Sequence, residues 1–193
     1  MNMLKSFFFK MPPTEQLIQQ MASNNNSKAL EAVTKLREKR ALQDGSLHSA
    51  NLKQANLAGA KMARANLQQA ILIEANLKGC YLGSTDLNAA NLQRANLSSA
   101  NLRDTLLHNA DLSEANLEMA HMATSNLQDT NLQNANLRNA NLWSADLKGA
   151  NLEGADVRGA NFHGVEFDER TILPDGQSWS PEIDMTNYTR GNR

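Results

Sequence analysis

The residues best suited to catalysis or metal binding are few in this sequence. They are four histidines, His48, His108, His121 and His163, and a single cysteine, Cys80. Imidazole and thiolate groups could hold a metal ion or form a nucleophile–base pair, but either use needs two or more such side chains close together. The five residues stand outside any Gly-rich phosphate loop, G-x-S-x-G motif or His–Cys pair at catalytic spacing. One cysteine also excludes a disulfide framework and a cysteine-based zinc cluster.

The composition of the chain is strongly biased. Among 193 residues there are 27 Leu, 26 Ala and 24 Asn. Ordinary enzyme domains do not have such a bias, which indicates internal repeats. The formal net charge is −1, which argues against a generic polyanion binder, so we expect no direct binding of nucleic acid. No apolar run approaches the ~20 residues of a membrane-spanning helix.

The repeat itself has a period of five residues. An apolar residue recurs every five positions from Leu47 to Phe167 without an insertion, which makes 25 units, and 20 of these apolar residues are Leu. Two positions earlier, 18 units carry Ala, and the position between holds Asn in 14 units and Asp in four more. We call the apolar residue the centre of its unit.

This pattern predicts a solenoid of very short strands. Small and large apolar residues two apart project to one side of an extended segment, and the Asn or Asp between them faces the other way. A period of five does not fit an amphipathic helix, whose inward positions recur at three and four. A single unit cannot bury its own leucine, so the units must stack, with their leucines forming a continuous column inside.

Units such as Ala50–Gln54 (ANLKQ) and Ala135–Asn139 (ANLRN) resemble the pentapeptide-repeat family, whose units follow A-(D/N)-L-x-x. The resemblance covers residues 45–169. It implies an all-β solenoid, a right-handed quadrilateral β-helix of pentapeptide repeats with four units per coil. Periodicity alone fixes neither the number four nor the handedness. Just over six coils would span roughly 30 Å at a strand spacing of ~4.8 Å.

The four-sided coil that the resemblance implies also separates the reactive side chains. His48 and His108 would lie three coils apart on one face, and His121 and His163 two coils apart on another. Neither pair could share a metal ion. Cys80 takes an inward position, where we expect a buried structural thiol. We therefore expect no catalytic, metal or cofactor site, and a protein that is not an enzyme.

The first part of the chain, residues 1–44, precedes the repeats. We expect a short helix over residues 14–22 and a capping helix over residues 28–42, with Ser27 as the N-cap and Asp44 and Gly45 ending the second helix. A stacked β-helix ends in unpaired strand edges, and repeat proteins need caps over such ends. The helix at 28–42 would supply the N-terminal cap.

The last part, residues 170–193, should contain the C-terminal cap and a flexible tail. We expect Ile172, Leu173 and Trp179 to fold back over the final coil. At the other end of the chain, Phe7–Phe9 are too few for a secretory signal, so the alternatives are a flexible end and a small anchor. A cytoplasmic location is expected, and the single cysteine is consistent with it.

Grouping the outward residues by four units, as the resemblance implies, gives four faces of unequal charge. The fourth face, centred on Met62 and the residues that follow it at intervals of 20, nets +2 and departs most often from the consensus. Tyr, Trp and Arg are enriched at protein interfaces. The candidate protein-binding residues of this face are Lys61, Arg64, Tyr81, Arg103, His121 and Trp143. The first face, centred on Leu47 and its successors, nets −5 and carries an acidic cluster of Asp146, Glu166, Asp168 and Glu169.

Two functions follow as hypotheses. The first is a non-enzymatic structural or protein-interaction module, a rigid rod that presents one face to an unidentified protein partner and could form a homodimer through its coil ends. The alternative is a topoisomerase (DNA gyrase) regulator acting by partial DNA mimicry, as some members of the family do. Residues 45–169 carry a net charge of only −4, whereas a ~30 Å length of DNA carries on the order of 18 negative charges. The first hypothesis is therefore preferred.

Overall fold

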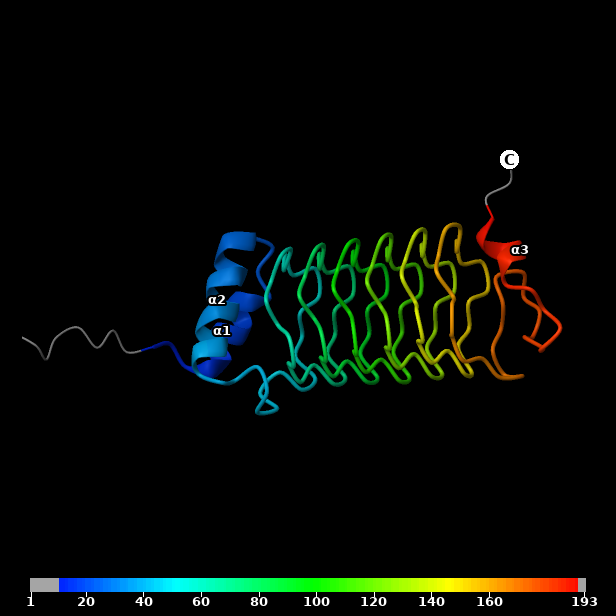
Figure 1. Cartoon of the computed structure of the whole chain (residues 1–193). Coiled ribbons are helices and arrows are strands. Elements are labelled where there is room, and N and C mark those ends of the chain that lie inside the picture. Colours follow the sequence, from blue (N-terminus) through cyan, green and yellow to red (C-terminus); the bar gives the residue numbers. More distant parts are fainter. Residues whose placement is uncertain (1–10, 191–193) are drawn as a thin grey trace, which may run out of the picture.

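The chain forms a rod of stacked coils with helices at its two ends (Figure 1). The computed structural model describes residues 11–190, so Phe7–Phe9 and the anchor considered for them lie outside the described residues. Helix α1 (Thr14–Met21) and helix α2 (Asn26–Glu38) lie at the N-terminal end of the rod, and the short helix α3 (Thr186–Thr189) lies at the other end. The coils lie between them.

Strand pairing in the coils is parallel and links residues 20 positions apart. The bridges run from Asn51↔Ile71 to Asp146↔Glu166, each at the residue that precedes the centre of a unit. Four units therefore complete one coil. Within residues 11–190 the strand segments are isolated bridges rather than longer strands, because each unit turns after its centre.

A tight turn follows the centre of each unit. In the unit centred on Leu52, the N–H of Ala55 donates to the carbonyl oxygen of Leu52 at 3.1 Å, and the third residue of the turn, Gln54, is left-handed with φ of 58°. The left-handed conformation recurs at this turn position in all units from Ser49 to Gly164. A positive φ at the third residue is the type II pattern. The turn thus bends the chain at every fifth residue.

The core is the leucine column that the sequence predicts. The centres from Leu47 to Leu152 are at most 1% exposed, and the alanines two residues earlier are also buried. Five inward positions hold a hydroxyl or thiol residue in place of Ala; four of them donate to a centre's carbonyl oxygen 23 residues earlier, as Thr105 does to Leu82 at 3.0 Å. The fifth, Ser125, donates to Met122.

Helix α2 begins and ends earlier than the sequence predicts. The predicted range 28–42 with Ser27 as the N-cap is wrong, because the side chain of Asn25 accepts the N–H of Lys28 at 3.1 Å and the helix begins at Asn26. It ends at Glu38 because Arg40 is left-handed, with φ of 61°. The N–H of Ala41 donates to the carbonyl oxygen of Leu36, and the N–H of Arg40 to that of Arg37. These two bonds form a Schellman motif.

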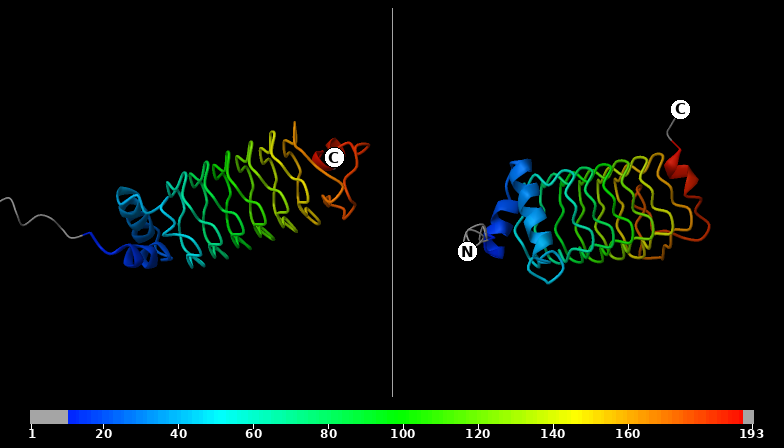
Figure 2. Two further views of the ribbon diagram at one scale, coloured as in Figure 1. Left: turned by 90° about the horizontal axis from the view of Figure 1, so that it is seen from below. Right: turned by 60° about the vertical axis from the view of Figure 1, so that its left-hand side comes forward.

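The helical segment covers the open edge of the first coil (Figure 2). The carbonyl oxygens of Ser23 and Leu42 accept the N–H groups of Asn56 and Asn66 at 2.9 and 2.7 Å. The side-chain amide of Asn26 donates to the carbonyl oxygens of Asn56 and Ala58, both at 3.1 Å. In later coils the corresponding groups pair with the neighbouring coil, so the cap replaces a missing coil at these points.

The C-terminal cap continues the coil before it covers it. Ile172 pairs in parallel with Asn151, one residue beyond the interval of 20, and Leu173 is fully buried. Residues 171–175 thus form a further unit after a one-residue insertion at Arg170, rather than folding back as expected for Ile172. Trp179 does cover the end, stacking on Phe167 with ring centroids 5.7 Å apart.

Candidate interaction surfaces

The fourth face brings the candidate protein-binding residues onto one side of the rod. Parallel bridges join Lys61 to Tyr81, Tyr81 to Asn101 and Asn101 to His121, so these side chains occupy the same position in successive coils. All six candidate residues are exposed. Tyr81 exposes 53% of its surface and Trp143 exposes 45%, so the exposed apolar side chains of this face are aromatic, whereas those of the other faces are Ile71, Leu106 and Met119.

Most units protect the first N–H of their turn with a side chain. The Oδ1 atom of the Asn or Asp before the centre accepts the N–H of the residue two positions after it, as Asn96 accepts the N–H of Ser98 at 3.1 Å. All 18 units with Asn or Asp at this position have the bond, at 2.9–3.5 Å. This local bond is the Asx turn, and it explains why the repeat favours Asn or Asp at this position.

Seven units within residues 11–190 have neither Asn nor Asp before the centre, and in four of them no other protein group accepts the N–H. Within residues 11–190, the N–H groups of Ala63, Ile73, Gly83 and Ala123 have no protein acceptor. Three of them, at Ala63, Gly83 and Ala123, lie on the fourth face, because Lys61, Tyr81 and His121 replace Asn or Asp there. Sequence reasoning noted these replacements but missed the unpaired backbone donors. The sequence does mark these three turns, because each replacement is followed two residues later by Ala or Gly, whose small side chains leave the backbone N–H uncovered.

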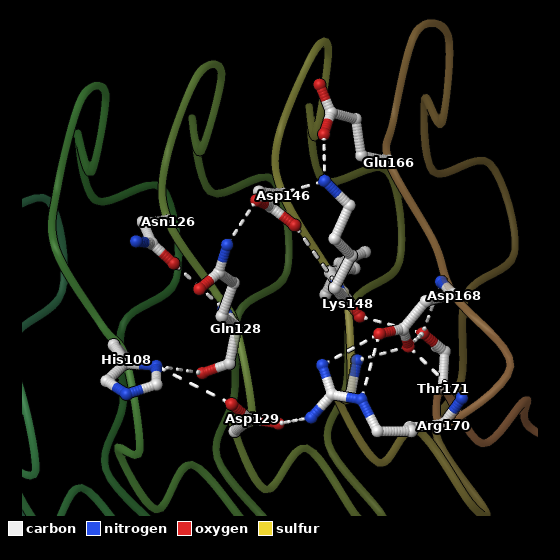
Figure 3. Close-up of polar contacts among 12 residues, drawn as sticks. His108, Asn126, Gln128, Asp129, Asp146, Lys148, Glu166, Asp168, Arg170 and Thr171 are labelled. Atoms are coloured by element: carbon white, nitrogen blue, oxygen red, sulfur yellow. Dashed lines mark hydrogen bonds and ion pairs between the residues drawn. The ribbon is translucent and has the colours of Figure 1, made fainter.

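Three members of the acidic cluster, Asp146, Glu166 and Asp168, lie close to cations (Figure 3). The guanidinium of Arg170 lies 2.7 Å from carboxylate oxygens of both Asp129 and Asp168. Lys148 forms an ion pair with Glu166 and lies 3.8 Å from Asp146. The net charge of −5 obtained for the first face from the sequence includes Lys148 as the one cation and leaves out Arg170. The structure corrects this, because Arg170 follows the regular repeats yet reaches back two coils.

Arg170 can reach Asp129 because a glycine lies between them. A Cβ atom on Gly149 would lie 2.1 Å from Oδ1 of Asp129 and 2.9 Å from a guanidinium nitrogen of Arg170. The N–H of Gly149 also donates to Oδ1 of Asp168 at 2.8 Å. Burial favours a raised pKa for Asp168, but the hydrogen bonds from Arg170 and Gly149 and the nearby positive charge hold its pKa below the ordinary 3.8. Asp168 is therefore ionised at neutral pH.

The thiol and the histidines offer little chemistry. Burial raises the pKa of Cys80 to about 12, and its thiol donates to the carbonyl oxygen of Leu57. His108 contacts the carbonyl oxygen of Gln128 at 3.2 Å and lies 3.8 Å from Asp129, so it belongs to the polar network of the first face. Among residues 11–190, no three His, Cys, Asp or Glu side chains gather closely enough to hold a metal ion.

Two clefts lie at the ends of the rod, one at each end. One, of about 330 Å³, lies between the last coil and the α3 segment and is lined by Phe162, His163 and Met185 among others. The other, of about 210 Å³, lies between α2 and the first coil and is lined by Val33, Arg37 and Lys61 among others.

Across residues 11–190, no helix has the length and apolar character needed to cross a membrane.

Comparisons with known proteins identify the repeat. The model of the family described as pentapeptide repeats matches residues 50–88, 90–124 and 125–164, with eight copies. No curated protein matches the chain.

Several solved structures are similar to the chain. A pentapeptide repeat protein (Rfr23) from the cyanobacterium Cyanothece 51142 is 42% identical over 47% of this chain and 62% of its own length, less than two thirds, with a TM-score of 0.47. HetL from Nostoc sp. strain PCC 7120, a pentapeptide repeat protein involved in heterocyst differentiation regulation, is 32% identical over 68% of this chain and 76% of its own, with a TM-score of 0.38. QnrB1, a plasmid-mediated fluoroquinolone resistance protein, is 17% identical over 62% and 78%, with a TM-score of 0.26.

Proposed function

The chain belongs to the pentapeptide-repeat family, and from that premise we propose that it is a non-enzymatic interaction module, a rod that presents its fourth face to a protein partner. Within this proposal the coil is wound right-handed, as the family's fold implies. The division into residues 1–44, 45–169 and 170–193 is proposed with it, as are a cytoplasmic location and self-association through the coil ends.

One observation carries the proposal: two large aromatic side chains are exposed on the same face as three cations. Tyr81 and Trp143 each leave about half of their surface accessible, and burying an aromatic side chain at an interface is strongly favourable. The backbone beneath them is held by bonds to the coils on both sides, so the face is fixed in shape before a partner arrives. Such preorganisation reduces the entropy lost on binding.

DNA mimicry receives no support from the first face. Lys148 and Arg170 form ion pairs with the carboxylates of this face, so the negative potential that would imitate DNA is weakened there. A regulator of topoisomerases would need a denser and more continuous array of free carboxylates. We therefore do not extend the proposal to DNA gyrase.

The test is affinity capture from the native host with wild-type protein and single variants. Tyr81→Ala and Trp143→Ala should each lower recovery of the partner by at least about tenfold, since such residues dominate interface energies. Met119→Ala is the matched control, because Met119 is 55% exposed on the third face. Unchanged recovery with both aromatic variants, at unchanged circular dichroism, would refute the assignment of the fourth face.

A further inference from the structure

We propose that the fourth face binds an acidic, extended segment of the partner protein, whose carboxylates accept the unpaired N–H groups of Ala63, Gly83 and Ala123. The inference rests on the proposed function and names the chemistry of the partner. Backbone N–H groups that project together from a rigid surface are suited to anions, and hydrogen bonds to a carboxylate are stronger than those to a neutral acceptor.

The spacing of the donors fits such a segment. Ala63 and Gly83 lie in adjacent coils, and Ala123 lies two coils beyond Gly83, as the bridges between their units show. At ~4.8 Å per coil the three donors span roughly 14 Å along the rod. An extended peptide advances about 3.4 Å per residue, so five residues span the row. The row therefore matches a short run of acidic residues.

The side chains around the donors leave the backbone accessible and favour negative charge. Most other units carry a longer side chain at the position of Ala63, Gly83 and Ala123. Lys61 and Arg64 are exposed and form no ion pair within residues 11–190. Arg103 also lies on this face, exposed, with Asp104 3.5 Å away. The face thus combines three cations with three uncharged donors.

A peptide fits this surface better than a nucleic acid does. Three cations over roughly 14 Å would release few counterions, whereas duplex DNA carries a charge every ~1.7 Å. Tyr81 and Trp143 are exposed beside the donors and provide apolar contacts for a peptide's other side chains. The remaining unpaired donor, Ile73, lies on the second face between Ile71 and Glu74 and offers no comparable charge.

Proline substitution can remove the donors without changing the charge of the protein. Pro174 already occupies the corresponding turn position, in a turn closed by the N–H of Gly176 and the carbonyl oxygen of Leu173 at 2.9 Å. Proline suits the second residue of such turns. The triple variant Ala63→Pro, Gly83→Pro and Ala123→Pro therefore removes three N–H groups from intact turns. Ile73→Pro, which removes an equivalent donor from the second face, is the matched control.

The probe is a fluorescein-labelled hexaglutamate peptide, with hexalysine and a twelve-nucleotide single-stranded DNA as comparison ligands, measured by fluorescence anisotropy. Wild type and Ile73→Pro should bind hexaglutamate equally and in preference to both other ligands. The triple proline variant should bind it at least about tenfold more weakly, a loss of about 1.4 kcal/mol. The double variant Lys61→Gln and Arg64→Gln should also bind hexaglutamate more weakly. It replaces the triple proline variant in the test if that variant fails to fold.

Three outcomes would overturn the inference: no binding of hexaglutamate by wild type, equal affinity for the folded triple variant, or tighter binding of the DNA. The proposed function is judged separately. If Tyr81→Ala and Trp143→Ala abolish partner capture while hexaglutamate does not bind, the fourth face remains the binding surface and only the acidic partner is wrong.

Discussion

Two leucines that are adjacent in the sequence should lose very different amounts of stability on the same substitution. Leu107 is the centre of its unit and is 1% exposed, whereas Leu106 replaces the usual Asn or Asp and is 42% exposed on the first face. Leu107→Ala leaves a cavity inside the column, whose backbone is held on both sides by neighbouring coils and cannot collapse freely. Leu106→Ala shortens a side chain that already contacts water.

The magnitudes differ enough to measure. A buried leucine truncated to alanine costs about 2–5 kcal/mol of unfolding free energy, depending on how far the site relaxes. For Leu106→Ala we expect a loss below about 1 kcal/mol, because little apolar surface leaves a buried position. With a urea dependence of about 2 kcal/mol per M, a loss of 3 kcal/mol lowers the denaturation midpoint by roughly 1.5 M.

Urea denaturation followed by far-ultraviolet circular dichroism compares the two variants with wild type. Equal midpoints for Leu106→Ala and Leu107→Ala would refute the assignment of inward and outward positions. A larger loss for Leu106→Ala would reverse it.

The remaining predictions concern the thiol, one turn and the C-terminal ion pairs. Because burial raises the pKa of Cys80 to about 12, a maleimide should label it far more slowly in the native protein than in urea at pH 7; equal rates would contradict its burial. Met119→Gly should raise the unfolding free energy by up to about 1 kcal/mol, since Met119 has φ of 57° and its side chain is exposed; a lower midpoint would contradict this. Arg170→Ala should destabilise the C-terminal cap, because it removes the ion pairs with Asp129 and Asp168. Amide hydrogen exchange at residues 171–179 should then be faster, and unchanged exchange would show that these ion pairs do not stabilise the cap. The pKa of Asp168 in the folded protein is below 3.8, its ordinary value in the unfolded chain, so the ionised carboxylate stabilises the fold above pH 3.8. This stabilisation is lost as the pH falls through the pKa of the folded state. An Asp168→Asn variant should therefore lose less stability than wild type on acidification.

The sequence predicts the interior of the rod well because the interior is periodic. The five-residue repeat of Leu and Ala predicts that these side chains face the interior, and they are buried there. The number of units per coil depends on pairing between residues 20 apart, which a period of five cannot reveal. The bridges of the structure supply it, as that from Asn51 to Ile71 shows.

Prediction was weaker where one residue departs from the pattern. Helix α2 ends at Glu38 because Arg40 adopts a left-handed conformation. Arginine has no preference for that conformation, so the sequence does not indicate it. The inserted Arg170 breaks the period and hides the unit at residues 171–175. It also pairs with Asp129, 41 residues earlier, which only the winding of the chain brings within reach.

The candidate surface was predicted in part. The replacement of Asn or Asp by Lys61, Tyr81 and His121 drew attention to the fourth face, and all three side chains are exposed there. The regular recurrence of Asn indicates backbone hydrogen bonding, but it does not identify the N–H group two residues after the centre as the donor. Once that bond is seen, the same replacements also explain why the backbone N–H groups of Ala63 and Gly83 are unpaired.

The distance between coils tests the central claim most directly, because every surface discussed depends on residues 20 apart lying side by side. Spin labels at Gln54 and Glu114 occupy one turn position three coils apart, and labels at Gln54 and Asn134 are four coils apart. Double electron–electron resonance should give narrow distributions whose means differ by about 4.8 Å, one strand spacing. Broad distributions, or a difference unrelated to the strand spacing, would contradict the four-unit coil and the faces built on it.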